Sequence, residues 1–339
     1  QTIDQLIKKF DKSIDSLHTI NEFNGNILLV KNGIRLYEKS IGFTNSKANQ
    51  RLNSSSAFNL ASISKTFTSS LILMYVQEGK LKIDDQVHSY LPSFPYKDIT
   101  IRHLLNHTHG MIEYFDWIND TLKINDTIGN DQLLVLLSKY KPALNSVPGE
   151  KFNYCNTGYA VLSKVLETIS GVPYAALLKS KITKPLKLEN TYVQTVKMSN
   201  SPKNRVYGMQ YKEGRWNTYD LTTLDEVVGD GNIYSTVYDL QKWDQALRDG
   251  KVLKPEILNE AYTPSVLIEK PKMVYGLGWI INEPGKKVSH SGSWNGFKNN
   301  MVRDLQNGYT LISLSNGTSG ITSYKLLDQF EKALSNLKQ

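Results

Sequence analysis

The sequence predicts an α/β protein of the α+β type, with a central antiparallel sheet flanked by helices and an inserted, mostly helical region. Strand-like runs occur near both ends of the chain, whereas the middle has helical patterns separated by prolines. Short turns join the later strand-like runs, which favours antiparallel pairing. We therefore expect residues 1–75 and 225–339 to contain the sheet and residues 76–224 to form the helical region, together as one unit.

Each predicted element follows from a local pattern. Apolar residues at helical spacing open the chain, and the turn Lys31-Asn32-Gly33 joins two strand-like runs as a hairpin. A later helical pattern stops at Gly79. The predicted helices cover residues 3–17, 63–77, 132–138, 159–168, 174–180 and 324–337. The predicted strands cover residues 26–30, 35–41, 276–281, 286–290, 297–303 and 309–315. We expect the first hairpin to join the late strands in one sheet.

Composition and charge exclude several classes of protein. Of 339 residues, 40% are hydrophobic and 21% are charged, which supports a full core and argues against disorder. The 40 basic and 32 acidic residues give a formal charge of +8. The longest basic clusters are short, such as Lys8-Lys9, and no nucleic-acid-binding motif is present, so we expect no nucleic-acid partner. A weak attraction to anionic cell-wall polymers or membranes stays open.

Cysteine and histidine usage argues against disulfides and metals. The single cysteine, Cys155, excludes an intrachain disulfide and a thiolate metal cluster. His103, His107 and His109 are closely spaced but lack an H-E-x-x-H pattern, so we expect no metal and no cofactor.

No apolar run approaches the roughly 18 residues of a membrane helix, and no signal peptide is present. Whether Gln1 follows a cleaved signal stays open.

The run Ser62-Ile63-Ser64-Lys65 is an S-x-x-K pattern at the start of a predicted helix. Positions i and i+3 share a helical face, so Lys65 can reach the Ser62 hydroxyl. The helix N-terminus stabilises developing negative charge, and a lysine shielded from water loses its proton more readily. The pattern therefore predicts Ser62 as a nucleophile and Lys65 as its base, although S-x-x-K alone often arises by chance.

The run Tyr154-Cys155-Asn156 follows Pro148-Gly149, so we expect it in a loop. In extended backbone, Tyr154 and Asn156 point the same way and can face one cleft, while Cys155 points away as a packed structural cysteine. A tyrosine near a cationic lysine can shuttle protons, and Asn156 could orient a substrate amide. The alternative is an ordinary loop tyrosine and asparagine.

The run His290-Ser291-Gly292-Ser293 ends a strand-like segment. Without a side chain, Gly292 would let a substrate backbone approach closely. The N–H of Ser293 could pair with that of Ser62 as an oxyanion hole. We therefore expect these residues to bind substrate.

Together these three runs resemble the serine β-lactamase and penicillin-binding protein superfamily, which uses S-x-x-K, Y-x-N or S-x-N, and K-T-G in this order. Four further segments are similar: residues 102–110, with His109 where serine is usual; residues 231–240, with Asn232 where glycine is usual; residues 275–279; and residues 315–317. The likeness covers about residues 20–335. It is closest to the branch of class C β-lactamases, D,D-peptidases and esterases, because Tyr154 fills the second-base position.

The resemblance implies a β-lactamase/transpeptidase-like fold with an active site between its two parts. It implies acylation of Ser62 followed by hydrolysis of the acyl-enzyme, with oxyanion-hole N–H groups from Ser62 and Ser293. It also implies a small-molecule or short-peptide substrate, for which a cell-wall peptide is one candidate, and a periplasmic or secreted location. One departure is His290, which stands where K-T-G has lysine. We expect His290 to have an ordinary pKa of about 6.5 and to gain charge on acidification.

The sequence leaves several alternatives open. The resemblance does not select among amide, ester and lactam bonds, and the oligomeric state is unknown. A catalytically silent module that senses cell-wall peptides or binds penicillin is the main alternative. The presence of all three of Ser62, Lys65 and Tyr154 favours an enzyme.

Overall fold

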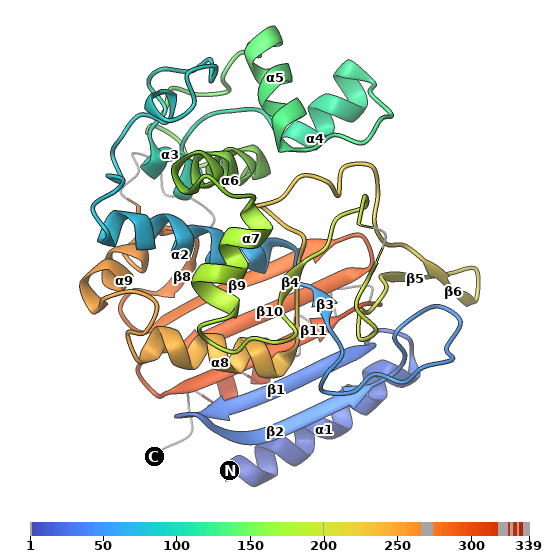
Figure 1. Ribbon diagram of the computed structural model, residues 1–339. Coiled ribbons are helices and arrows are strands. Elements are labelled where there is room, and N and C mark those ends of the chain that lie inside the picture. Colours follow the sequence, from blue (N-terminus) through green and yellow to red (C-terminus); the bar gives the residue numbers. More distant parts are fainter. Residues whose placement is uncertain are drawn as a thin grey trace.

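The computed structural model describes residues 2–198, 200–265, 274–317, 325, 328–330 and 332–334. These residues form a six-stranded antiparallel sheet with the order β2-β1-β11-β10-β9-β8 (Figure 1). Its strands are β1 Gly25–Lys31, β2 Ile34–Ile41, β8 Ile280–Glu283, β9 Lys287–Trp294, β10 Phe297–Asp304 and β11 Tyr309–Ser315. The prediction that the first hairpin joins the late strands is confirmed, because β1 pairs with β11.

Alternation along β1 separates two apolar layers. Ile27 and Leu29 pack with helix α1 (Ile3–Thr19) on one face of the sheet, whereas Leu28 and Val30 belong to the larger core on the other face. Successive strand side chains point to opposite faces, and both faces are covered here, so β1 is apolar almost throughout. The described residues of the helix predicted at 324–337 pack in the same layer as helix α1, where the ring of Phe330 stacks on that of Phe10.

The larger core lies between the sheet and a group of helices. Helix α2 (Ser64–Gln77) runs through it, below the helices at the top of Figure 1. The other α-helices are α3 Ile101–Leu105, α4 Tyr114–Asp116, α5 Asn130–Tyr140, α6 Asn156–Ser170, α7 Tyr174–Leu178, α8 Val237–Arg248 and α9 Pro255–Ala261. Helix α2 is buried on nearly all sides, which explains why its sequence carries so few charges.

The predicted α/β class is confirmed, but helices α3, α4, α8 and α9 were not predicted. Strand β9 continues to Trp294, so the run His290–Ser293 lies within the strand and not at its end. The strand predicted at 276–281 begins only at Ile280, because the preceding residues form a turn in which Gly276 N–H bonds to the Trp279 carbonyl. The helix predicted at 324–337 lies largely outside the described residues; those described there are helical. Five short strands were not predicted, since two to four residues carry no readable period: β3 Phe58–Asn59, β4 Tyr192–Val193, β5 Met209–Lys212, β6 Arg215–Thr218 and β7 Ile233–Ser235.

In the described part of the chain, no single helix combines the length and hydropathy required to cross a bilayer. Helix α6 and the segment Tyr174–Thr183 meet that requirement only when taken together across a 74° bend.

Candidate active site

Ser62 lies in a 3₁₀ turn, Ala61–Ile63, that leads into helix α2. Ala61 has a φ of 49°, in the left-handed region that non-glycine residues rarely adopt. Its N–H donates to Asn59 Oδ1 over 2.8 Å, which helps to hold the turn. Backbone strain of this kind persists only where the surroundings enforce it, and here it directly precedes Ser62.

Gly292 of strand β9 holds the Ser62 turn against the sheet. A Cβ atom at this position would lie 2.1 Å from the Leu60 carbonyl oxygen and 3.2 Å from the Ala61 side chain. The backbone that approaches Gly292 closely is therefore that of the segment carrying Ser62. This corrects the expectation that the space beside Gly292 receives substrate backbone.

Lys65 is fully buried beneath Ser62. Its Nζ lies 3.1 Å from Ser62 Oγ, 2.6 Å from Asn156 Oδ1 and 2.9 Å from the backbone oxygen of Asp230. The i, i+3 spacing thus brings the amine to the hydroxyl, as predicted. A neutral amine has two N–H groups and one lone pair. The charged form donates to all three oxygens, whereas in a neutral form the bonds to Asn156 and Asp230 would leave the lone pair for the Ser62 hydroxyl.

Tyr154 and Asn156 face the same cavity, although Asn156 begins helix α6 rather than lying in a loop. Lys65 Nζ lies 5.1 Å from the centroid of the Tyr154 ring, and the His107 ring packs at 4.2 Å from it. Cys155 points away, as expected: its Sγ donates to the Ile112 carbonyl at 3.3 Å, and burial raises its thiol pKa to about 12.

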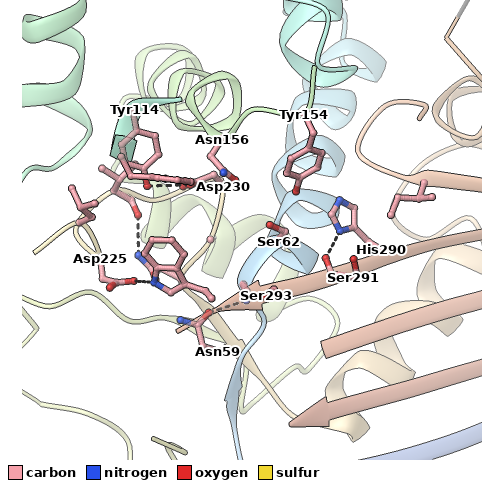
Figure 2. A pocket seen from close by; sticks show the side chains of 18 residues that line it. Asn59, Ser62, Tyr114, Tyr154, Asn156, Asp225, Asp230, His290, Ser291 and Ser293 are labelled. Carbon is pink, nitrogen blue, oxygen red and sulfur yellow. Dashed lines mark hydrogen bonds between the residues drawn. The ribbon is translucent and has the colours of Figure 1, made fainter. Parts of the chain in front are cut away.

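The cavity has a volume of about 280 Å³. In Figure 2, Ser62, Tyr154 and His290 lie on one side, and Asp225 and Asp230 lie on the other. Most of the residues predicted from the sequence line it: Ser62, Tyr154, Asn156, His290, Ser291 and Ser293. The lining also includes Asn59, Ala61, Tyr114, Phe115, Leu224, Asp225, Val227, Asp230, Gly231, Asn232, Ile280 and Trp294.

His290 is buried, and both of its ring nitrogens bond to protein atoms. Nδ1 lies 2.6 Å from the Ser291 carbonyl, to which it must donate, so Nε2 accepts from the Tyr275 hydroxyl at 2.8 Å. Burial, aided by the nearby Lys65 charge, lowers the pKa of His290 to about 3. The expected pKa of about 6.5 is therefore wrong, and His290 is neutral near pH 7. A cation does lie nearby, because Lys298 Nζ donates to Ser293 Oγ.

Three carboxylates at or beside the cavity were not found from the sequence: Asp225, which accepts from Trp294 Nε1, Glu113 and Asp230. Glu113 Oε2 accepts from Asn156 N at 2.9 Å and Nδ2 at 2.8 Å, and burial raises its pKa to about 7. Asp230 Oδ2 accepts from the Tyr114 hydroxyl at 3.2 Å, and burial raises the pKa of Asp230 too. All three lie in segments without regular secondary structure, and Glu113 is far from the two aspartates along the chain, so no spacing in the sequence indicates them.

Each of the three clustered histidines accepts a hydrogen bond from a backbone N–H group. Thr100 N donates to His103 Nδ1, Cys155 N to His107 Nδ1, and Met111 N to His109 Nδ1, over 3.3, 3.2 and 3.0 Å. Within the described ranges, no group of three or more histidine, cysteine, aspartate or glutamate side chains is arranged to hold a metal.

Known proteins are similar to this chain along nearly its whole length. The model of the family described as Beta-lactamase matches residues 4–334. Penicillin-binding protein 4* of Bacillus subtilis is 33% identical over 323 residues, which cover 91% of this chain and 71% of that protein.

Two solved structures have the same fold. A penicillin-binding protein from Bacillus halodurans superposes with a TM-score of 0.81 at 23% identity, covering 98% of this chain and 99% of that one. A D-amino acid amidase from Ochrobactrum anthropi superposes with a TM-score of 0.80 at 20% identity, with the same coverage. At such identities these structures establish the β-lactamase/transpeptidase-like fold.

Proposed function

This chain belongs to the Beta-lactamase family and is a serine hydrolase, and we propose that Ser62 is the nucleophile its substrates acylate. The observation that carries this proposal is the contact of 3.1 Å between Lys65 Nζ and Ser62 Oγ. Once Lys65 has lost a proton, its two remaining N–H groups have acceptors in Asn156 and Asp230, which leaves the lone pair for the serine proton. Ser293 Oγ in the same wall also bonds to an amine, that of Lys298, but Lys298 is only half-buried.

In the proposed mechanism, Ser62 Oγ attacks the substrate carbonyl carbon while its proton passes to Lys65. The N–H groups of Ser62 and Ser293 hold the oxyanion of the tetrahedral intermediate. The bond to the leaving group then breaks, and Tyr154, in proton exchange with Lys65, protonates that group. Water next attacks the acyl-enzyme, gives up a proton to the same pair and releases the acid together with free Ser62.

We further propose that the substrate is a small amide or ester, including short peptides derived from the cell wall. Neutral His290 supports a neutral amide or ester, since it cannot supply the permanent cation that the K-T-G lysine offers a carboxylate. For a peptide with a C-terminal carboxylate, the nearby Lys298 would have to supply that cation. The relative Penicillin-binding protein 4* is by its name a protein that binds penicillin, and on that likeness we propose a periplasmic or secreted location for this chain.

We also propose that the two sequence-predicted parts, residues 1–75 with 225–339 and residues 76–224, act as one catalytic unit. Residues from both parts line the cavity, for example Ser62 and His290 from the first and Tyr114 and Asn156 from the second. Neither part alone would hold a complete set of the proposed groups.

Covalent labelling tests the nucleophile. Treatment with a fluorophosphonate should add one adduct by intact mass, and peptide mapping should find it on Ser62. Ser62→Ala should abolish the adduct and lower kcat/KM for an activated ester by several orders of magnitude. The matched control, Ser291→Ala, removes a hydroxyl from the same cavity and should still be labelled at Ser62. An adduct that survives Ser62→Ala would refute the assignment.

A double-mutant cycle tests the proton-transfer pair. If Lys65 and Tyr154 act as one unit, the losses in kcat/KM from Lys65→Ala and Tyr154→Phe should not be additive in free energy. Strictly additive losses would contradict a shared role. Stable penicillin binding without turnover of any ester or amide would instead support the silent sensor module.

A further inference from the structure

The partly buried carboxylate of Glu113 bonds to Asn156, the residue whose side-chain oxygen contacts Lys65 Nζ. Glu113 precedes the short helix α4, and its Oε1 accepts from Tyr114 N at 3.1 Å. Its Oε2 accepts two bonds from Asn156, one from the backbone N–H and one from the side-chain Nδ2. All three contacts are N–H donors, so the site fits the ionised carboxylate and not a protonated one or an amide.

The bond from Asn156 Nδ2 determines which way the Asn156 amide faces. An asparagine amide has an acceptor oxygen on one side and an NH₂ donor on the other. With Nδ2 bonded to Glu113, Oδ1 points to Lys65 Nζ at 2.6 Å. A reversed amide would present NH₂ to Lys65 and its oxygen to the Glu113 carboxylate, and neither contact would be favourable.

The direction of this amide matters for the chemistry of Lys65. A reversed Asn156 would donate to the amine lone pair, which the proposed mechanism directs at Ser62. It would also leave one N–H of the buried amine without its acceptor, which is costly away from water. The orientation of one amide therefore decides whether Lys65 can take the serine proton.

We propose that Glu113 is a positioning residue for the hydrolase reaction: it orients Asn156 so that the lone pair of Lys65 faces Ser62. This inference rests on the proposed function of Ser62 and Lys65. Glu113 itself contacts neither of them in this role and acts only through Asn156.

The ionisation of Glu113 should then affect the rate. Burial and the charge of Asp230 raise its pKa, the bonds from Asn156 and the charge of Lys65 lower it, and the result is about 7. The other groups that face it are the Tyr114 phenol and the Cys155 thiol, whose pKa values are both raised, so both are neutral. Protonation below about pH 7 replaces an acceptor by a donor, so acylation should accelerate as pH rises through that range.

The experiment measures the second-order rate of fluorophosphonate labelling and kcat/KM for an activated ester, from pH 5.5 to 8.5. Glu113→Gln must place an NH₂ group against one of the N–H donors, and we expect both rates to fall by roughly 10-fold to 100-fold. The rise near pH 7 should disappear, because glutamine does not ionise. Glu113→Asp keeps the carboxylate and should recover most of the rate and retain a pH-dependent rise.

A cycle with Asn156→Ala separates positioning from a structural role. If Glu113 acts through Asn156, Glu113→Gln should cost at most about 3-fold more in the Asn156→Ala background. Losses that multiply, or wild-type labelling by Glu113→Gln at every pH, would overturn the inference. Thermal unfolding of each variant checks that it folds. If Glu113→Gln does not fold, Glu113→Asp takes its place in the test. Loss of both the labelling rate and its pH-dependent rise in Glu113→Asp would then count against a positioning role. Labelling of the parent away from Ser62 would instead refute the proposed function.

Discussion

Replacing Gly292 by alanine should push the turn that carries Ser62 away from strand β9. The new Cβ would lie 2.1 Å from the Leu60 carbonyl oxygen, whereas ordinary contacts begin at 3.4 Å. The neighbour is backbone and cannot rotate away, so either the turn or the strand must move by about 1 Å. A misplacement of about 1 Å in a reacting group costs roughly 100-fold in rate, which corresponds to about 2.7 kcal/mol. Overpacking should also lower the free energy of unfolding by about 1–3 kcal/mol.

The assay compares kcat/KM for an activated ester, and the rate of Ser62 labelling, between Gly292→Ala and Gly231→Ala. Gly231 lines the same cavity, but a Cβ there would have no atom within 4 Å, so it controls for adding a methyl group near substrate. Urea denaturation of both variants reports stability. If Gly292→Ala keeps kcat/KM within about 3-fold of Gly231→Ala, the Ser62 turn tolerates displacement and the reasoning from its strained geometry is wrong.

Three further predictions follow from the buried and charged groups. Because the pKa of His290 is about 3, it stays neutral from pH 5.5 to 8.5, so the ratio of kcat/KM for a penicillin to that for a neutral ester should be flat; a rise on acidification would show that His290 titrates. Lys298→Met should lower kcat/KM for a carboxylate-bearing substrate by about 5-fold and leave a neutral ester unchanged, whereas equal losses would argue against anion binding. Asp244→Asn removes the counter-charge of buried Arg303, 2.6 Å away, and should lower the free energy of unfolding in urea by about 3–5 kcal/mol; a loss below about 1 kcal/mol would contradict an essential ion pair.

Local patterns predicted the parts of the site whose geometry is local. The i, i+3 spacing of Ser62 and Lys65 brings the two side chains together, and the β1–β2 hairpin forms around its predicted turn. The orientation of Cys155 also followed from its place between two cavity residues. In each case neighbours along the chain determine the contact, so the sequence alone carries the information.

Only the resemblance to the serine β-lactamase and penicillin-binding protein superfamily placed the three motif runs in one active site, because local patterns do not connect them. Nothing in the spacing between Tyr154 and Ser62 predicts that they face one cavity. Their proximity depends on how helix α6 packs against helix α2 in the larger core.

By itself, the sequence determined the α/β class, the hairpin and the Ser62–Lys65 pair, because periodicity and short spacings act within a single element. Only the tertiary structure decided three further points: Glu113 bonds to Asn156, Gly292 makes room for Leu60, and His290 is neutral. The physical reason is that each depends on atoms brought from distant segments. Packing sets how closely two backbones approach, and the loss of water around a buried group sets its pKa. The residues next to a group along the chain determine neither the packing nor the loss of water.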